Sequence, residues 1–296
     1  MAFANPGSLA GGAGGVRAVS TAASEWVKRY LALIGIDREA PSLDGLGRLI
    51  RAHVATVPFE NSGSLLRRLA AGTDPVPPLD SEALLAAWEA RSAGGVCFEH
   101  TEMFGRLLGA LGYSSLPIAG EISFPGSHQA LLVDIGGARW LVDVGNGAPF
   151  FEPIPLDRPY EIRRAGLGYR FRADPADTAV WVQERALESG WKPYCRYLLR
   201  PQSPADRDIA YQRHHRARET WVTNTIVFIR SSEDEVLVFR DGDQTRYTPN
   251  GKIAERAEDI AAWAQLPVLL GLPALPLSAV ARAWALINGR ATPPGA

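Results

Sequence analysis

The chain has 296 residues, 46% of them hydrophobic and 21% charged, which is typical of a globular protein with a sizeable core. Its formal net charge is -1, so it has no basic surplus that would suit nucleic acid or an anionic membrane as a partner. No uncharged apolar run reaches the length of a membrane helix. Two cysteines and no CxxC pair indicate neither a disulfide framework nor a zinc site, so we expect no metal and a reducing, cytoplasmic location.

The first third of the chain is predicted to be helical after a flexible tail. Residues 1–22 are rich in Gly, Ala and Ser, and they lack the basic start and compact apolar block of a signal peptide. Apolar residues then recur at helical spacing from Ser24 to Gly35, from Ser42 to about Pro58, from Asp80 past Trp88, and from Phe98 to Leu111. Ser42 and Asp80 are suitable N-caps, and Gly112 is a suitable stop.

Short strand-like runs begin after Tyr113. They lie at Leu131–Ile135, Trp140–Val144, Tyr169–Arg172 and Ala179–Gln183, with turn signals such as Gly136-Gly137 between them. Further strands at Thr223–Ile229 and Glu235–Phe239 and helices around Ala254–Ala264 and Ala279–Ile287 complete the chain. This order predicts an α+β fold with an antiparallel sheet or small barrel in its centre.

The segment Gly94-Gly95-Val96-Cys97 contains the first candidate for chemistry. The two glycines allow a tight turn, which places Cys97 at the start of the helix that runs to Leu111. A helix start offers free N–H groups and a positive dipole end, which favour a thiolate and can stabilise an oxyanion. The alternative is a buried structural cysteine, a common state for a free thiol.

His128 and Asp143 are the second candidate feature. His128 stands directly before an apolar strand, and Asp143 lies at the end of the next strand after a short Gly136-Gly137 turn. An antiparallel hairpin would bring the two side chains together as a base and its orienting carboxylate. Taken singly, His128 could be a surface loop residue and Asp143 a turn residue. The residues alone therefore leave a Cys-His-Asp thiol enzyme and a structural interpretation both open.

Several motifs together resemble the arylamine N-acetyltransferases. Residues 91–105 are similar to that family's active-site signature of Gly-Gly, aromatic, Cys, aromatic and Glu. The element His53-Val-Ala-Thr-Val-Pro-Phe-Glu-Asn61 resembles the family's Pro-Phe-Glu-Asn element, and Val-Asp143-Val-Gly matches its aspartate. The resemblance runs from about Trp26 to about Asp208.

The resemblance implies a three-part body. A helical domain over residues 23–112 would carry Cys97, a β-barrel over 113–222 would carry His128 and Asp143, and an α/β lid would span 223–296. It also implies ping-pong chemistry, in which Cys97 takes an acyl group from a thioester and passes it to an amine. The donor would be acetyl-CoA or another acyl-CoA, or an acyl carrier protein, with a small-molecule amine as acceptor and no tightly bound cofactor.

The sequence departs from the family pattern around the triad. Ala93 replaces an arginine, Val96 an aromatic residue, and His100 and Thr101 an apolar residue and Asn. Asn146 replaces a Phe that ordinarily lines the acceptor pocket, which argues against a flat arylamine as natural acceptor. These changes suggest a specialised relative such as an ansamycin-type amide synthase.

Other residues have supporting or structural interpretations. Glu60 and Glu99 are expected to brace the site by hydrogen bonds, whereas His100 could face either the pocket or the core. We interpret His214-His215 as a solvated basic turn and Cys195, which has no glycine cradle or adjacent base, as buried and inert. The full set of supporting or substrate-binding candidates is Phe59, Glu60, Phe98, Glu99, His100, Gly145, Asn146 and Gly147.

Three alternatives to an acyl-CoA-dependent N-acyltransferase remain. An amide synthase would take its acyl group from a carrier-protein thioester and would need a docking surface instead of a nucleotide cleft. A Cys-His-Asp hydrolase or transglutaminase-like enzyme would admit water to the acyl-enzyme. A non-catalytic binding relative would have had no reason to keep all three triad residues.

Overall fold

A computed structural model of the protein describes residues 21–256 and 260–290. Its first part is helical and is interrupted only by the short strand β1, which spans Phe59–Glu60. Ser42 accepts the Gly45 N–H at 3.0 Å, and Asp80 accepts the N–H groups of Glu82 and Ala83, so both predicted N-caps are confirmed. The helices are α1 (Thr21–Ile34), α2 (Leu43–Thr56), α3 (Ser62–Ala71), α4 (Ser81–Glu89) and α5 (Cys97–Leu111).

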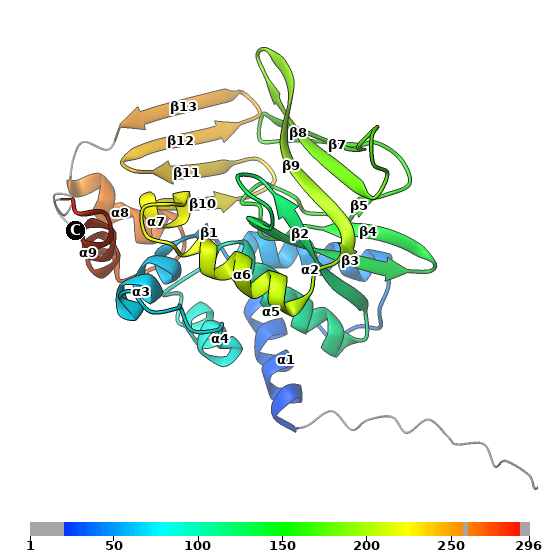
Figure 1. Ribbon diagram of the computed structural model, residues 1–296, viewed down its shortest axis with the longest axis horizontal. Coiled ribbons are helices and arrows are strands. Elements are labelled where there is room, and N and C mark those ends of the chain that lie inside the picture. Colours follow the sequence, from blue (N-terminus) through cyan, green and yellow to red (C-terminus); the bar gives the residue numbers. More distant parts are fainter. Residues whose placement is uncertain (1–20, 257–259, 291–296) are drawn as a thin grey trace, which may run out of the picture.

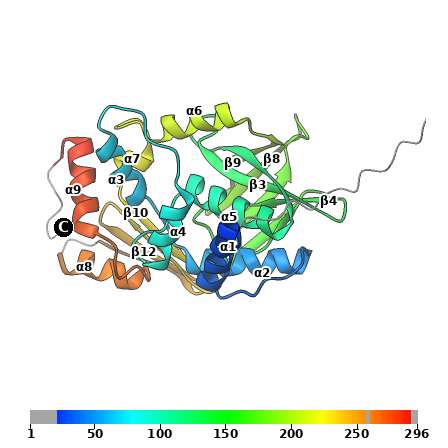
Figure 2. The same cartoon turned by 90° about the horizontal axis from the view of Figure 1, so that it is seen from below.

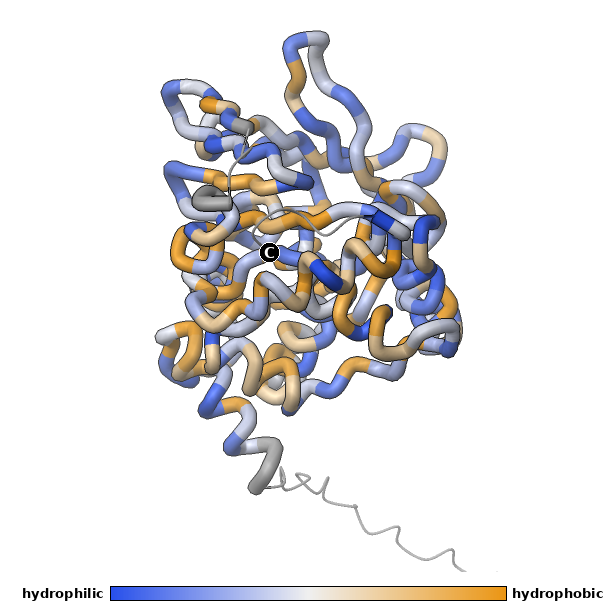
Figure 3. Tube along the Cα trace, turned by 90° about the vertical axis from the view of Figure 1, so that its left-hand side faces the viewer, coloured by the Kyte–Doolittle hydropathy of each residue, from blue (hydrophilic) through white to orange (hydrophobic). Residues whose placement is uncertain are grey.

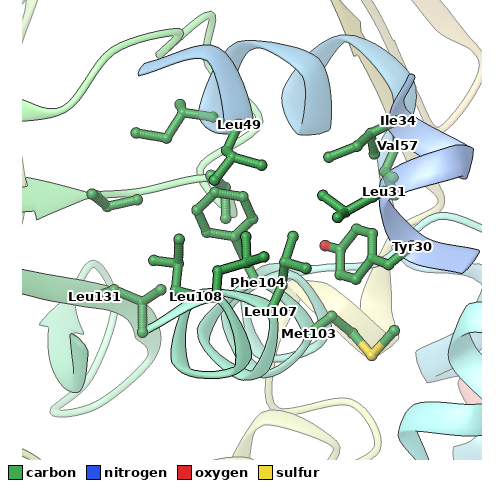
Figure 4. Close-up of a cluster of buried hydrophobic side chains, with 14 of the residues drawn as sticks. Tyr30, Leu31, Ile34, Leu49, Val57, Met103, Phe104, Leu107, Leu108 and Leu131 are labelled. Atoms are coloured by element: carbon green, nitrogen blue, oxygen red, sulfur yellow. The ribbon is translucent and has the colours of Figure 1, made fainter. Parts of the chain in front are cut away.

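The apolar faces of α1, α2 and α5 meet in one buried cluster (Figure 4). Leu107 of α5 lies beside Tyr30 of α1, and Leu108 lies toward Leu131, as the close-up shows. The helix α1 starts at Thr21, two residues inside the predicted tail, and the rest of that tail lies outside the described residues. The sequence pattern missed α3, whose two adjacent arginines interrupt a short apolar stripe.

The second part is an eight-stranded antiparallel sheet with the order β5-β4-β3-β2-β9-β8-β7-β6. Phe171, Trp181, Tyr197 and Leu132 share one buried cluster although they lie on four different strands, so the sheet curls into a nearly closed barrel around them. Its strands are β2 (Ser114–Glu121), β3 (His128–Ile135), β4 (Ala138–Val142), β5 (Ile154–Pro155), β6 (Tyr160–Arg164), β7 (Leu167–Ala173), β8 (Val180–Leu187) and β9 (Gly190–Pro201).

The sequence pattern missed four strands of this sheet: the short strands β5 and β6, and the strands β2 and β9, which pair with each other. The strands β2 and β9 contain prolines, Pro117 and Pro193 among them, and alternate poorly between buried and exposed residues, which obscures the period of two. The turn between β8 and β9 projects from the top of the molecule and is mostly hydrophilic, whereas hydrophobic segments gather in the lower, helical half (Figure 3).

The third part is a five-stranded sheet in the order β1-β10-β11-β12-β13, covered by two helices (Figure 1). Because β1 lies between α2 and α3 and pairs with β10, this sheet is joined to the helical first part. The elements are β10 (Val227–Ser231), β11 (Val236–Arg240), β12 (Asp243–Thr248), β13 (Gly251–Arg256), α8 (Ile260–Leu269) and α9 (Leu277–Asn288).

Two predicted elements in this region are wrong at their starts. The predicted strand at Thr223–Ile229 begins only at Val227, because residues 221–224 form the short helix α7 (Trp221–Asn224). The predicted helix around Ala254–Ala264 begins at Ile260, since residues 254–256 belong to β13, which is held by pairing with β12. Tertiary pairing overrides the local helical preference of this alanine-containing stretch.

A helix that the sequence pattern did not indicate, α6 (Pro204–His214), connects the barrel to α7. It lies between the barrel and α7 in two perpendicular views (Figures 1 and 2). Ala210 and Tyr211 on its buried face pack in one cluster with Cys97 and Phe98 at the start of α5. Among the described helices, none is long and apolar enough to cross a membrane.

Candidate active site

Cys97 is the first residue of α5, as predicted, and the turn before it has room only for glycine. A Cβ atom added at Gly94 would lie 2.1 Å from the Pro58 carbonyl oxygen, and one at Gly95 would lie 2.7 Å from the Glu99 Cβ. The Gly95 carbonyl accepts the Glu60 N–H at 2.8 Å, which ties the turn to β1. The sheet of the third part therefore helps to fix the position of the cysteine.

Two buried carboxylates brace this turn. Glu60 Oε1 accepts the Gly94 N–H at 2.6 Å, and its other oxygen accepts the Ser62 N–H. Glu99 accepts the Val96 N–H at 3.1 Å and forms an ion pair with Arg67. Both side chains hold backbone at the helix start and do not point at the cysteine sulfur, in agreement with the bracing interpretation of these residues.

His128 and Asp143 meet across the β3–β4 hairpin, with 2.8 Å between His128 Nε2 and Asp143 Oδ2. Asp143 also accepts hydrogen bonds from the Tyr197 hydroxyl at 2.6 Å and from the Asn146 side-chain amide at 2.9 Å. Its other oxygen accepts the Gly145 N–H at 3.2 Å. The carboxylate is thus fully buried but well supplied with donors.

These contacts set the charges of the pair. Burial opposes a charge on His128, but the Asp143 carboxylate and a hydrogen bond with Cys97 outweigh burial and raise the pKa of His128 well above 6.5. Burial likewise opposes the charge on Asp143, yet His128, Tyr197 and Asn146 together lower the pKa of Asp143. At neutral pH the pair is therefore an imidazolium bound to a carboxylate.

The loop after Asp143 lies directly against the cysteine. A Cβ added at Gly145 would lie 2.7 Å from Cys97 Cα, and one at Gly147 would lie 2.9 Å from Ile229. The Cys97 thiol is also 4.0 Å from the Ser127 carbonyl oxygen, which it faces as a weak donor. The structure thus brings together the three residues that are far apart in the sequence: Cys97, His128 and Asp143.

Asn146 binds the triad carboxylate. Its side-chain amide donates to Asp143 at 2.9 Å and to the Gln183 side-chain oxygen at 3.1 Å, and it is buried. The replacement of an aromatic residue by Asn therefore adds a donor to the triad carboxylate.

His100 faces the core and not Cys97. Its Nδ1 is 2.8 Å from His53 Nε2, and His53 Nδ1 is 2.9 Å from the Tyr30 hydroxyl. Burial lowers the pKa of His100 to about 4, so its ring is neutral at neutral pH. Its ring is stacked on Phe59 at 6.3 Å, and Phe59 in turn stacks on Trp221 of α7 at 6.0 Å.

His214 and His215 are buried, so the solvated basic turn predicted for them is wrong. They close α6, whose last turn packs on the start of α5, and Phe98 lies 5.0 Å from the His214 ring. No metal site accompanies them, because no group of three potential ligands lies together in residues 21–256 and 260–290.

Cys195 is buried, as expected, but a glycine and a base do lie beside it. A Cβ added at Gly120 would lie 3.1 Å from its sulfur and 2.9 Å from His128 Cβ. Burial raises the pKa of Cys195 to about 12, which keeps it a thiol and so inert as a nucleophile.

The reacting groups are closed off in this structure. Cys97 is 2% exposed, and a cavity of about 240 Å³ lined by Val54, Arg91 and Arg230 touches none of the triad residues. Hydrogen bonds and paired charges converge on the triad and not on this cavity.

A model of the N-acetyltransferase family matches residues 42–268. The chain belongs to the arylamine N-acetyltransferase family. It is 31% identical over 193 residues to the arylamine N-acetyltransferase of Mycolicibacterium smegmatis, and the match covers 61% of this chain and 67% of the relative. It is 28% identical over 189 residues to the proansamycin X synthase of Amycolatopsis mediterranei, which is 61% of this chain and 70% of that relative.

The fold agrees with this membership. The structure of the Mycobacterium marinum arylamine N-acetyltransferase in complex with CoA covers 89% of this chain, and the chain covers 98% of it, with a TM-score of 0.75 and 23% identity. As a member of the arylamine N-acetyltransferase family, the chain is an acyltransferase, and the hydrolase and binding-protein alternatives have no support in these comparisons.

Sequence reasoning missed several residues around the site. Tyr197 donates to the Asp143 carboxylate and to Gln183. Arg67 forms the ion pair with Glu99. Tyr197 lies on β9, which has no clear strand pattern, and Arg67 lies on α3, which was not predicted. The sequence does carry a signal for Gln183, because a polar residue directly after the apolar run Val180-Trp-Val continues a buried strand and needs a partner there. In the structure Gln183 is fully buried.

Proposed function

We propose that the protein transfers an acyl group from a thioester, with acetyl-CoA as the donor, to the nitrogen of an amine through an acyl-enzyme on Cys97. The observation that carries this proposal is the buried His128–Asp143 pair beside a cysteine at a helix start. In this scheme Cys97 is the nucleophile, His128 is the base and Asp143 orients the base. The CoA complex of the Mycobacterium marinum relative supports the choice of donor.

The first half-reaction is thioester exchange. The imidazolium of His128 stabilises a thiolate on Cys97, which attacks the thioester carbonyl while the N–H groups of the α5 start face the oxyanion. The C–S bond to CoA breaks, and His128 gives its proton to the departing CoA thiolate. One thioester replaces another, so the step costs little free energy.

The second half-reaction forms the amide. The neutral His128 accepts one proton from the incoming amine as its nitrogen attacks the acyl carbon, the C–N bond forms and the C–S bond to Cys97 breaks. The imidazolium and the thiolate are thereby restored. Asp143 keeps its charge throughout and holds the His128 ring in one orientation.

Intact mass measurement after incubation with acetyl-CoA tests the proposal. We expect the wild-type protein and the Cys195→Ala variant to gain the mass of one acetyl group, whereas Cys97→Ala gains nothing. Cys195→Ala is the matched control because it removes the other buried thiol of the chain. Acetylation of Cys97→Ala, or its loss in Cys195→Ala alone, would contradict the assignment of the nucleophile.

A second candidate function is amide formation from a carrier-protein thioester, and the likeness to a proansamycin X synthase favours it. A carrier-protein user presents only the pantetheine arm to Cys97 and needs no site for the nucleotide. If Cys97 is acylated by a pantetheine thioester of a larger acyl group and not by acetyl-CoA, this second function replaces the first. Acylation by acetyl-CoA at low concentration would exclude it as the main activity.

A further inference from the structure

His214 lies at the end of α6, beside Phe98 in the first turn of α5. Ala210 and His214 are one helical turn apart on α6, so they share a face, and Ala210 packs in the same buried cluster as Cys97 and Phe98. The His214 ring lies 5.0 Å from the Phe98 ring and 6.1 Å from the Trp221 ring. The imidazole is thus set among aromatic rings next to the first turn of α5.

The two adjacent histidines differ in their hydrogen bonds. His215 Nδ1 donates to the Tyr211 carbonyl oxygen at 2.9 Å, and its ring packs on the Tyr211 ring at 4.4 Å, so His215 secures the end of α6. The Nε2 atoms of both rings are buried and have no hydrogen-bond partner within the described part of the chain, but His214 lies against Phe98 at the start of α5, whereas His215 packs on Tyr211. Leaving a buried ring nitrogen unpaired costs free energy, which a bound group could recover.

The surroundings of His214 decide its charge. Burial is the main cause that lowers the pKa of His214 well below 6.5, and the nearby basic groups His215, His128 and Arg67 lower it further. The ring is therefore neutral at neutral pH. A neutral imidazole with its proton on Nδ1 offers the lone pair of Nε2 as an acceptor.

We propose that His214 determines specificity for the acyl acceptor: its unpaired ring nitrogen accepts a hydrogen bond from the second N–H of a primary amine as that amine attacks acyl-Cys97. This inference rests on the proposed acyl-enzyme. A primary amine has two N–H groups, of which one gives its proton to His128 and the other stays on the nitrogen of the amide product. The retained N–H is the one that His214 holds, so no further reactant is needed.

The test uses enzyme that has first been acylated and then mixed with amine in a single turnover. The variants are His214→Phe, which removes the acceptor, and His214→Gln, which keeps one, with His215→Phe as the matched control. The acceptors are a primary aromatic amine and its N-methyl derivative, which has only one N–H. The stoichiometry of acylation reports in every case whether the variant is folded and competent.

We expect His214→Phe to acylate as the wild type does but to transfer to the primary amine about tenfold more slowly, the effect of losing one hydrogen bond at a buried group. Transfer to the N-methyl amine should be unchanged, and His214→Gln should recover part of the lost rate. His215→Phe should leave the ratio of the two amines at the wild-type value.

Equal slowing of both amines in His214→Phe, or no slowing of either, would overturn the inference. If His214→Phe does not acylate, the comparison of His214→Gln with His215→Phe decides in the same way, from the ratio of the two amines. Failure of the wild-type protein to form any acyl-enzyme is a separate result, because it refutes the proposed function and not the role of His214 alone.

Discussion

The single histidine of the barrel and the pair of histidines among the helices have opposite preferences for charge. On the barrel side, His128 is paired with the Asp143 carboxylate, and the pKa of His128 is raised. On the helical side, His53 and His100 bind only each other and Tyr30, and burial lowers the pKa of both. All of these rings are buried to a similar degree, so the carboxylate and not the burial decides which histidine is charged.

The comparison extends to the whole chain. Four of the five histidines, at positions 53, 100, 214 and 215, have lowered pKa values, and only His128 has a raised one. Asp143 is the only carboxylate within ion-pair distance of a histidine in the described residues. The protein thus concentrates one charged imidazole where the thiol is, in surroundings that otherwise keep imidazoles neutral.

Removing the charge of Asp143 should have the largest effect. Asp143→Asn keeps the size of the side chain but removes the charge that raises the pKa of His128, so we expect the rate of acyl-enzyme formation to fall by about 10⁴-fold. Release of CoA in a stopped-flow burst measures this rate. Asp134→Asn, at an exposed position of the same hairpin, is the control. A loss of less than about tenfold would show that the carboxylate is not needed for the base.

Lowering the pH should destabilise the fold through the neutral histidines before it affects the His128–Asp143 pair. A histidine with a lowered pKa binds a proton more readily in the unfolded chain than in the folded protein. His100 and His215 each have a pKa of about 4, so protonation of these residues destabilises the fold as the pH drops below 6.5. From pH 7.5 to 4.5 each should cost roughly 2–3 kcal/mol in the free energy of unfolding. Urea unfolding at the two pH values measures the difference.

The stability contributed by the His128–Asp143 pair depends on pH in a different way. The stabilisation from His128 is complete below pH 6.5 and is lost only as the pH rises through its raised pKa. The stabilisation from Asp143 is present above pH 3.8 and is lost as the pH falls through its lowered pKa.

His100→Gln removes one of the neutral histidines, so the free energy of unfolding of this variant should fall less steeply with acid than that of the wild type. An unchanged slope in that variant would mean that His100 is already protonated in the folded state.

A smaller change should follow from loosening the orienting carboxylate without neutralising it. Tyr197→Phe removes the hydroxyl that donates to Asp143 at 2.6 Å, so we expect acylation to slow by about tenfold. Tyr169→Phe, in the same barrel core, is the control because its hydroxyl is not among the groups that donate to Asp143 in the described residues. Equal rates in both variants would show that Asn146 and Gly145 hold the carboxylate sufficiently by themselves.

The sequence alone determined the local features of this protein. Helical spacing and the side chains of Ser42 and Asp80 located four helices, and the glycine pair placed Cys97 at a helix start, because caps and tight turns depend on neighbours in the chain. The β3–β4 hairpin could be predicted from a short turn between two apolar runs. This hairpin places His128 and Asp143 close together without any long-range contact.

Tertiary structure decided what depends on partners far along the chain. The strand β1 is formed by pairing with β10, which comes from the last part of the chain. Whether a histidine is charged depends on which groups are folded around it, so the sequence could not show that His214 is buried or that Asn146 binds Asp143. Burial and charge pairing are properties of the assembled core, and no local pattern records them.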